Sequence, residues 1–263
     1  MKSISDYINN HQNNHSNVAV VWGSGTSVNS LNPAEYSSFL NIAVNASIML
    51  FPSWYEGSAK NRISISLDAE AIYWDWFPTA DTKCHRFLRK CSHPLDRYGN
   101  VSTNPNKWVF PKEMYEADNT YCFNRRQRNI NLINFENIDS CPYVNTAPLS
   151  IDIAVKTGAK LIALAGMEQI PNENNITHFY QTWPKDKQPK FGDQGKFPRG
   201  SPFNLPYKRH MRRWRRYTDT IYNFQLEAIK RGIRIIRLSE KSALSFIPYM
   251  SEKEFLSKAK KIQ

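Results

Sequence analysis

Val18-Ala19-Val20-Val21-Trp22, followed by Gly23-Ser24-Gly25-Thr26-Ser27-Val28, is the stretch that decides the fold of this chain. A run of apolar and β-branched residues that ends in a Gly-x-Gly turn predicts a buried strand that opens onto a ligand-facing loop. Glycine lets the backbone approach a ligand closely, and the hydroxyls and amides of the following Ser and Thr residues can surround an anion. The turn favours an α/β protein that binds a nucleotide or a phosphate.

The turn departs from the two best-known phosphate-binding fingerprints. A dinucleotide turn has a third glycine with a helix directly after it, whereas this chain has Val28 there, and residues 29–33 are typical of a loop. No Gly-Lys-Ser/Thr follows, which excludes a P-loop. An ordinary strand-to-loop turn remains the alternative for this segment.

The rest of the chain predicts one α/β domain. Strands are expected at 18–22, 42–45, 48–50, 62–67, 161–166 and 233–238, and helices at 33–36, 150–157 and 212–231. This alternation argues for a Rossmann-like, mostly parallel sheet with helices on both faces, similar to the GT-A arrangement. Residues 71–145 predict short helices, loops and one hairpin, in a possible inserted subdomain. Residues 171–207 are too polar for a core and predict a lid or a flexible loop.

The composition of the chain limits the classes of protein to which it can belong. The 263 residues are 41% hydrophobic and 13% aromatic, which is enough for a packed core. No apolar run reaches the roughly 20 residues that span a bilayer, and the N-terminus lacks the apolar segment of a secretory signal. We therefore expect a soluble cytoplasmic protein, in the host cytoplasm if the chain is viral, with no membrane span.

Charge predicts an anionic partner. Lysine and arginine number 35 against 23 acidic residues, a formal net charge of +12. The densest basic stretch is 208–217, Lys-Arg-His-Met-Arg-Arg-Trp-Arg-Arg-Tyr, where arginines and aromatic rings can bind phosphates and stack on bases. The alternatives are a solvated basic helix face, or arginines that serve only the pyrophosphate of a nucleotide.

Polar residues follow several expected strands. They are Gly23-Ser24-Gly25, Asn45, Asp68, Gly166-Met167-Glu168 and Ser239-Glu240. Ligands in such sheets bind beyond the carboxyl ends of the strands, so these residues predict a site for an activated nucleotide. For Asp68 and Glu168, capping of a nearby helix is the structural alternative.

Four cysteines do not make a disulfide framework in a chain of this length. Cys84, His85, Cys91 and His93 are all possible zinc ligands, but their spacing matches no standard Cys-x-x-Cys pattern. Buried thiols and surface histidines are the favoured interpretation.

Three sequence blocks occur in a characteristic order. The first is Val20–Ser27; the second is Ala43-Val44-Asn45 followed by Ser66-Leu67-Asp68; the third runs from Thr146-Ala147-Pro148-Leu149-Ser150 to Gly166-Met167-Glu168. Together they resemble the bacterial sialyltransferases of the Campylobacter type and the related hydroxymethylpterin pyrophosphokinase-like family, which share a Rossmann-like core. Ser242-Ala243-Leu244 after the last strand is a weaker likeness to the sialyltransferase segment that closes over the nucleotide. Thr26 for proline, Ala147-Pro148 for Ser-Gly, and Glu168 for aspartate depart from the pattern.

The resemblance implies a glycosyltransferase that moves a sugar from a nucleotide-activated donor to an acceptor hydroxyl. The donor-binding residues that it implies are Gly23, Ser24, Gly25, Thr26, Ser27, Asn45, Thr146, Ser150, Gly166 and Ser242. Asp68, Glu168 and a general base complete the catalytic set. The base is His210, in the position nearest to the family's histidine before the last helix, with His178 as the alternative.

The leaving phosphate or the acceptor is expected to meet Arg209, Arg212, Arg213 and Trp214. We expect an anionic acceptor, either nucleic acid such as phage-type modified DNA or a charged glycan. No cofactor is required, although Asp68 and Glu70 are a carboxylate pair that can hold Mg²⁺ or Mn²⁺. Two other functions remain open: a pyrophosphokinase-like enzyme that uses ATP and Mg²⁺, and a non-catalytic nucleic-acid-binding module. The sequence leaves the oligomeric state open.

Overall fold

The structure of the protein is a computed structural model. It describes residues 2–11, 16–51, 61–66, 84–89, 112–123, 133, 135, 146–171, 174, 176–188 and 207–262. At residues 89, 112, 113 and 207–216 it describes the backbone alone.

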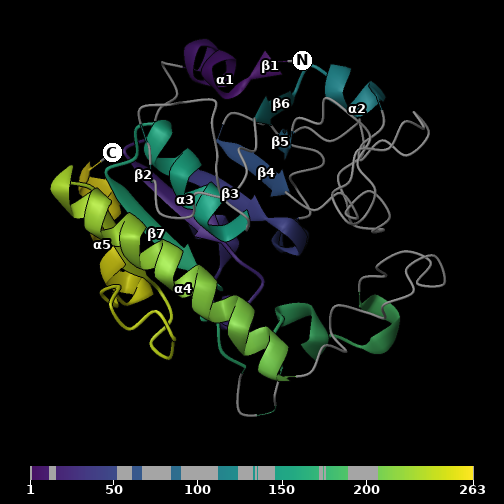
Figure 1. Ribbon diagram of the computed structural model, residues 1–263, viewed down its shortest axis with the longest axis vertical. Helices are drawn as coiled ribbons and strands as arrows, with labels where there is room; N and C mark the ends of the chain where they lie inside the picture. The colour runs from purple at the N-terminus through teal and green to yellow at the C-terminus, as the bar shows by residue number, and fades with distance from the viewer. Residues whose placement is uncertain are drawn as a thin grey trace.

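The described strands form one sheet in which every neighbouring pair is parallel (Figure 1). Their order across the sheet is β1-β6-β5-β4-β3-β2-β7-β8. The strands are β1 Lys2–Ser3, β2 Val18–Trp22, β3 Leu40–Val44, β4 Arg62–Ser66, β5 His85–Arg89, β6 Thr120–Phe123, β7 Leu161–Ala165 and β8 Arg234–Arg237. The predicted parallel sheet is confirmed.

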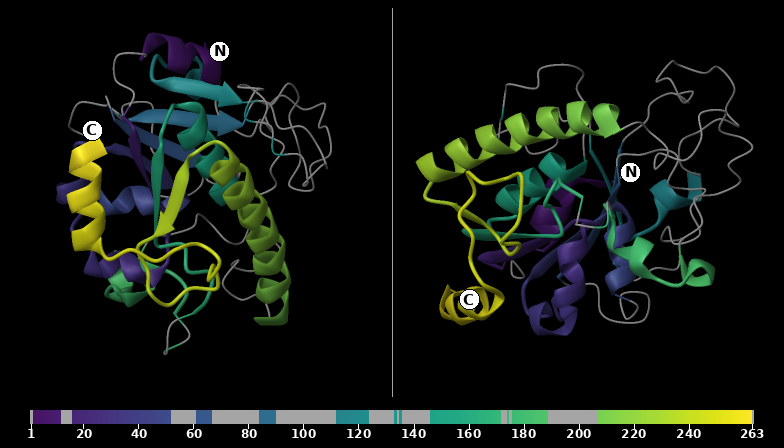
Figure 2. Two further views of the ribbon diagram at one scale, coloured as in Figure 1. Left: turned by 90° about the vertical axis from the view of Figure 1, so that its left-hand side faces the viewer. Right: turned by 90° about the horizontal axis from the view of Figure 1, so that it is seen from below.

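Helices cover both faces of this sheet (Figure 2). The α-helices are α1 Ile4–Asn10, α2 Lys112–Glu116, α3 Thr146–Lys156, α4 Tyr207–Lys230 and α5 Glu252–Ile262. The short 3₁₀ helices are η2 Thr26–Ser30, η3 Pro33–Tyr36, η4 Asn45–Leu50, η8 Phe179–Thr182 and η9 Lys185–Lys187. In the described part of the chain, none of the helices has the length and apolar character needed to cross a membrane.

Alternation along β2 divides the core in two, because successive side chains of a strand point to opposite faces. Val21 packs with residues of α3 and α4, such as Phe224. Trp22 packs on the other face with residues of η3 and α5, including Phe255. All five residues of β2 are buried, as expected for a central parallel strand covered on both sides.

Two local expectations are wrong. Residues 48–50 belong to η4 instead of a strand. Residues 29 and 30, expected in a loop at 29–33, belong to η2, which follows the glycine turn directly. In the described parts of 71–145, β5 and β6 pair in parallel, and the expected hairpin stays a prediction. The division of the chain into domains stays a prediction.

The segment 176–188 buries aromatic side chains although most of its residues are polar. Phe179 and Tyr180 are buried, and the Phe179 ring contacts the Trp183 ring at 5.3 Å between centroids. The Phe179 N–H donates to the carbonyl of Ser24 at 2.8 Å, which ties this segment to the glycine turn. The expectation that 171–207 is too polar for a core is therefore wrong for this part. Its role as a lid stays a prediction.

His85 is buried in a cluster of rings near the N-terminus. Its ring meets His11 at 4.6 Å, Tyr7 at 5.1 Å and Tyr121 at 5.6 Å between centroids. The expectation of a surface histidine is wrong here, whereas Cys84 is a buried thiol. Cys91 and His93 lie outside the described residues. Burial, with smaller contributions from the neighbouring His11 and Lys2, lowers the pKa of His85 to about 4.

This buried histidine makes the stability of the protein depend on pH. The pKa of His85 lies below its ordinary value of 6.5, so the unfolded chain binds more protons between these two pH values. The contribution of His85 to the free energy of unfolding is therefore fully present above pH 6.5. It falls by roughly 3 kcal/mol as the pH drops towards 4. In urea unfolding from pH 8 to pH 4, we expect His85→Phe to remove most of this loss. An unchanged pH slope in the variant would contradict the assignment.

Candidate active site

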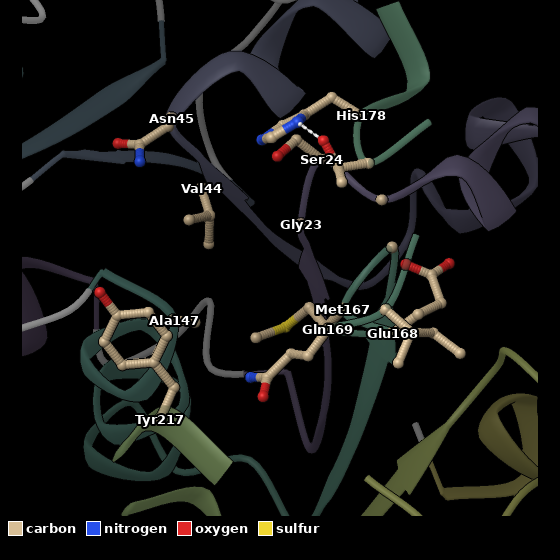
Figure 3. Close-up of a pocket in the computed structure, with 14 residues that line it drawn as sticks. Gly23, Ser24, Val44, Asn45, Ala147, Met167, Glu168, Gln169, His178 and Tyr217 are labelled. Carbon is tan, nitrogen blue, oxygen red and sulfur yellow. Dashed lines mark hydrogen bonds between the residues drawn. The ribbon is translucent and has the colours of Figure 1, made fainter. Parts of the chain in front are cut away.

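A pocket of about 180 Å³ opens at the carboxyl edge of the sheet, where β2 lies between β3 and β7. The chain order reverses here, since β3 to β6 continue on one side of β2 and β7 and β8 on the other. Open parallel sheets bind ligands at this reversal. We call it the edge pocket; it is lined by Gly23, Ser24, Gly25, Val44, Asn45, Ala147, Gly166, Met167, Glu168, Gln169, Ile170, Thr177, His178 and Tyr217 (Figure 3).

Two strand-end turns pack against each other beside this pocket. Gly23 N–H donates to the carbonyl of Ala165, and Gly25 N–H to that of Gly166, both at 2.7 Å. A Cβ at Gly23 would overlap the Gly166 carbonyl oxygen. The glycines of the first turn are thus required by the second turn, and these two N–H groups are occupied within the protein.

Glu168 connects these turns to the neighbouring segments through hydrogen bonds. Its side-chain Oε1 accepts the Ser27 N–H at 2.9 Å, and its backbone carbonyl accepts the Ala243 N–H at 2.8 Å. Ser242 Oγ donates to that same carbonyl at 3.2 Å. The carboxylate therefore caps η2 in this structure, which is the structural alternative expected for Glu168.

Two edge-pocket residues have strained backbones. Asn45 (φ 51°) and Gln169 (φ 57°) are the two non-glycine residues with positive φ in the described chain. Such strain costs about 1–3 kcal/mol and collects at functional sites. Asn45 Oδ1 is also buried without a hydrogen-bond partner. Gln169 Oε1 accepts from Thr218 Oγ1 of α4 at 2.8 Å. An unpaired amide oxygen at a strained position is a group that a ligand can satisfy.

His178 enters the edge pocket from the segment before η8, on the same side as Ser24 (Figure 3). Its Nδ1 lies 2.7 Å from Thr177 Oγ1. The side-chain oxygen of Gln181 accepts the N–H groups of Thr177 and His178, at 2.9 and 2.8 Å. One glutamine therefore fixes the backbone that carries the histidine.

Helix α4 overhangs the sheet at this edge. Its 24 residues span about 36 Å, whereas the five residues of β7 span about 17 Å. Buried Ile221, Phe224 and Ala228 anchor the C-terminal half, and the N-terminal half projects past the strand ends (Figure 2). Tyr217 lines the edge pocket. Position 210 lies two turns before it, on the same side of the helix.

A larger hollow adjoins the edge pocket. This side pocket measures about 680 Å³ and shares Glu168 and Ile170 with its neighbour. Its other walls come from η2, the segment after Glu168, and the residues after β8. It is lined by Thr26, Ser27, Asn29, Ser30, Glu168, Ile170, Pro171, Asn174, Leu238, Ser239, Glu240, Lys241 and Tyr249.

The structure brings together seven of the residues expected from sequence in the edge pocket. They are Gly23, Ser24, Gly25, Asn45, Gly166, Glu168 and the alternative base His178. Thr26 and Ser27 line the side pocket. Ser242 and the buried Thr146 and Ser150 line neither, and Ser150 Oγ donates to the Ala147 carbonyl at 2.6 Å.

Several of the predicted site residues lie outside the part of the chain that the structure describes. Asp68 and Glu70 lie outside the described residues, as do the side chains of Arg209, His210, Arg212, Arg213 and Trp214. Gln169 was not identified from sequence, although it directly follows a recognised strand end. Tyr217 was expected only as an aromatic ring of the basic stretch 208–217, and its place in the edge pocket was not predicted. Within the described ranges, no group of three or more His, Cys, Asp or Glu residues could hold a metal ion.

No family model and no curated protein matches the chain. Among solved structures, the comparison returns the monofunctional alpha-2,3-sialyltransferase Cst-I from Campylobacter jejuni. The two chains are 12% identical with a TM-score of 0.49, over 89% of this chain and 80% of that chain. The family that the sequence blocks resemble is thus also represented among the structural matches. A likeness this distant carries no argument about the activity of this chain.

The packing of the two turns predicts an energetic coupling between Gly25 and Glu168. A Cβ at Gly25 would overlap Glu168 Oε2 and lie 2.8 Å from the Gly166 carbonyl. We expect Gly25→Ala to destabilise the protein by about 1–3 kcal/mol, and by clearly less when Glu168→Ala is already present. Equilibrium unfolding of both single variants and the double variant measures the coupling. Strict additivity would contradict this packing.

Proposed function

We propose that the protein is a glycosyltransferase that moves a sugar from a nucleotide-activated donor to an acceptor hydroxyl. The edge pocket holds the reacting groups. The observation that carries the proposal is the presence there, at the reversal of strand order, of strained Asn45 with its unpaired amide oxygen and of His178. The motif blocks of the sequence supply the reaction class.

The sizes of the two pockets suggest that they hold different parts of the substrates. At about 180 Å³, the edge pocket is smaller than the roughly 300–1,000 Å³ of sites that enclose a whole small-molecule ligand. The side pocket, at about 680 Å³, lies within that range. We therefore assign the sugar–phosphate junction to the edge pocket and the bulk of one substrate to the side pocket.

Sugar transfer needs a base that takes the proton of the acceptor hydroxyl. Imidazole is the side chain best suited to this at neutral pH. Of the two candidates from sequence, His178 lines the edge pocket and has a fixed backbone, so we assign the base to it. The acceptor oxygen attacks the anomeric carbon as the bond to the donor phosphate breaks, and the hydroxyl proton passes to His178. His210 is retained as the second candidate.

The departing phosphate needs cationic donors. Arg213 lies one turn before Tyr217 in the overhanging half of α4, in a stretch that also carries Arg209, Arg212 and Trp214. We assign these residues to the phosphate and to an anionic acceptor, a charged glycan or nucleic acid. Asp68 keeps the place in the catalytic set that the sequence resemblance implies, and the ligand panel below tests binding with and without Mg²⁺ or Mn²⁺.

A ligand panel tests the proposal. Thermal unfolding is measured with CMP-, UDP-, GDP- and ADP-linked sugars, and with ATP, each with and without Mg²⁺ or Mn²⁺. Stabilisation by one nucleotide sugar is expected, because a ligand that binds only the folded state raises its stability. Stabilisation by ATP with Mg²⁺ alone would favour the pyrophosphokinase. No stabilisation by any nucleotide, together with tight, salt-dependent DNA binding, would favour the non-catalytic module.

Asn45→Gly separates binding from stability. Glycine tolerates the positive φ of this position, so we expect the unliganded variant to be at least as stable as the parent. Loss of the amide should remove most of the stabilisation by the nucleotide sugar. The readout is the same thermal panel. A variant that responds to the ligand like the parent would exclude Asn45 from the donor site.

Substitution of the two histidines identifies the base. With the donor found in the panel, we expect His178→Gln to lower kcat about 10²–10⁴-fold while donor binding persists. His210→Gln, the matched change on α4, should have a much smaller effect on kcat. Gln181→Leu should lower kcat less than His178→Gln, because it removes only the acceptor that fixes the His178 backbone. The opposite order of the two histidine variants would assign the base to His210.

A further inference from the structure

Helix α4 carries an exposed apolar strip on its outer side. Tyr222, Leu226 and Ile229 are 45%, 42% and 61% exposed. Their spacing of four and three residues puts them on one face of the helix, away from buried Phe224 and Ala228. Six large hydrophobic residues are exposed in the described chain, and three of them form this strip. Half of the exposed large hydrophobic residues of the described chain are therefore gathered on one face of α4.

No described element covers the strip. Figure 2 (right) shows α4 along the outside of the molecule, with α3 and the sheet on its inner side. Among the described residues, the strip has a ring contact at its margin, where Tyr222 meets Phe246 edge-on at 5.2 Å between centroids. The aliphatic ends of Leu226 and Ile229 are left to solvent. Their hydration is unfavourable unless a partner takes them up.

The surroundings of the strip are basic. Lys160, Lys230, Arg231 and Arg234 are exposed near the C-terminal end of α4. Lys230 pairs with Glu227 at 2.6 Å. Over its 24 residues, α4 contains seven basic residues and two acidic ones, Asp219 and Glu227. A partner for this surface must offer both negative charge and an apolar layer.

These two requirements select among the possible partners. A second copy of the chain would bring two basic helices together, which like-charge repulsion opposes. A nucleic acid would satisfy the charge and leave Leu226 and Ile229 in water. A bilayer with anionic lipids offers headgroups to lysine and arginine and an acyl boundary to apolar side chains, and an aromatic residue such as Tyr222 suits the interface between them.

We propose that the outer side of α4, around Tyr222, Leu226 and Ile229, docks the protein on an anionic phospholipid surface. The helix lies in the plane of the interface and does not cross it. Its sheet-facing side carries Tyr217 into the edge pocket, so docking brings that pocket close to the lipid surface. This inference is independent of the reaction that the pocket performs.

Vesicle flotation of the full chain tests the docking. The parent is mixed with phosphatidylcholine vesicles that contain about one-third phosphatidylglycerol, and with pure phosphatidylcholine vesicles. We expect binding to the anionic vesicles and little to the neutral ones. The double variant Leu226→Gln with Ile229→Gln should have a partition constant for the anionic vesicles that is lower by at least about tenfold. Ile262→Gln is the matched control, since Ile262 is 38% exposed on α5, on the other face of the sheet.

The control variant should bind like the parent, and the thermal midpoints of all variants should agree to show that they are folded. Three results would overturn the proposal: no binding of the parent to anionic vesicles, equal binding of the parent and the double variant, or equal binding to neutral and anionic vesicles. Analytical sedimentation of the parent and the double variant can give a fourth result that would overturn the proposal. A parent dimer that dissociates in the double variant would assign the strip to a second copy of the chain.

Discussion

The contact between two turns at the carboxyl ends of β2 and β7 determines the rest of the site. Gly23 and Gly25 give their N–H groups to the carbonyls of Ala165 and Gly166, and the backbones approach too closely for a side chain at either glycine. This approach lets the Glu168 carboxylate reach the start of η2. It also forms the wall that the edge and side pockets share. The most informative glycines of the sequence are thus explained by packing first, and by ligand binding only through the pocket that the packing creates.

Sequence reasoning succeeded where hydrophobic periodicity was strong. The strands at 18–22, 62–66 and 161–165 and the helix that ends near Gly158 were located to within a few residues. The edge of the sheet that bears the pocket followed from topology alone, because residues after parallel strands meet at one edge. The sequence alone therefore predicts that Asn45 and the two glycine-containing turns belong to one site.

The failures have physical causes. Residues 48–50 are as apolar as a strand, but positive φ at Asn45 starts a 3₁₀ helix there. The segment around Phe179 looks polar because two buried rings are diluted by charged neighbours. Tyr217 reaches the edge pocket because α4 is longer than the strands that it covers, a property of three-dimensional arrangement that no local pattern contains. The capping role of Glu168 depends in the same way on a contact between distant segments.

The pairing of β2 with β7 also sets the order in which the protein can form during synthesis. β2 is complete near residue 22, but its partner β7 begins at Leu161, with β3 to β6 made in between. At 5–20 residues per second, the ribosome leaves one edge of β2 unpaired for roughly seven to thirty seconds. During that interval the glycine turn has nothing to pack against, and the nascent sheet offers an open edge to other chains. Such long-range pairing slows folding, so this protein builds its binding site among the last of its structures.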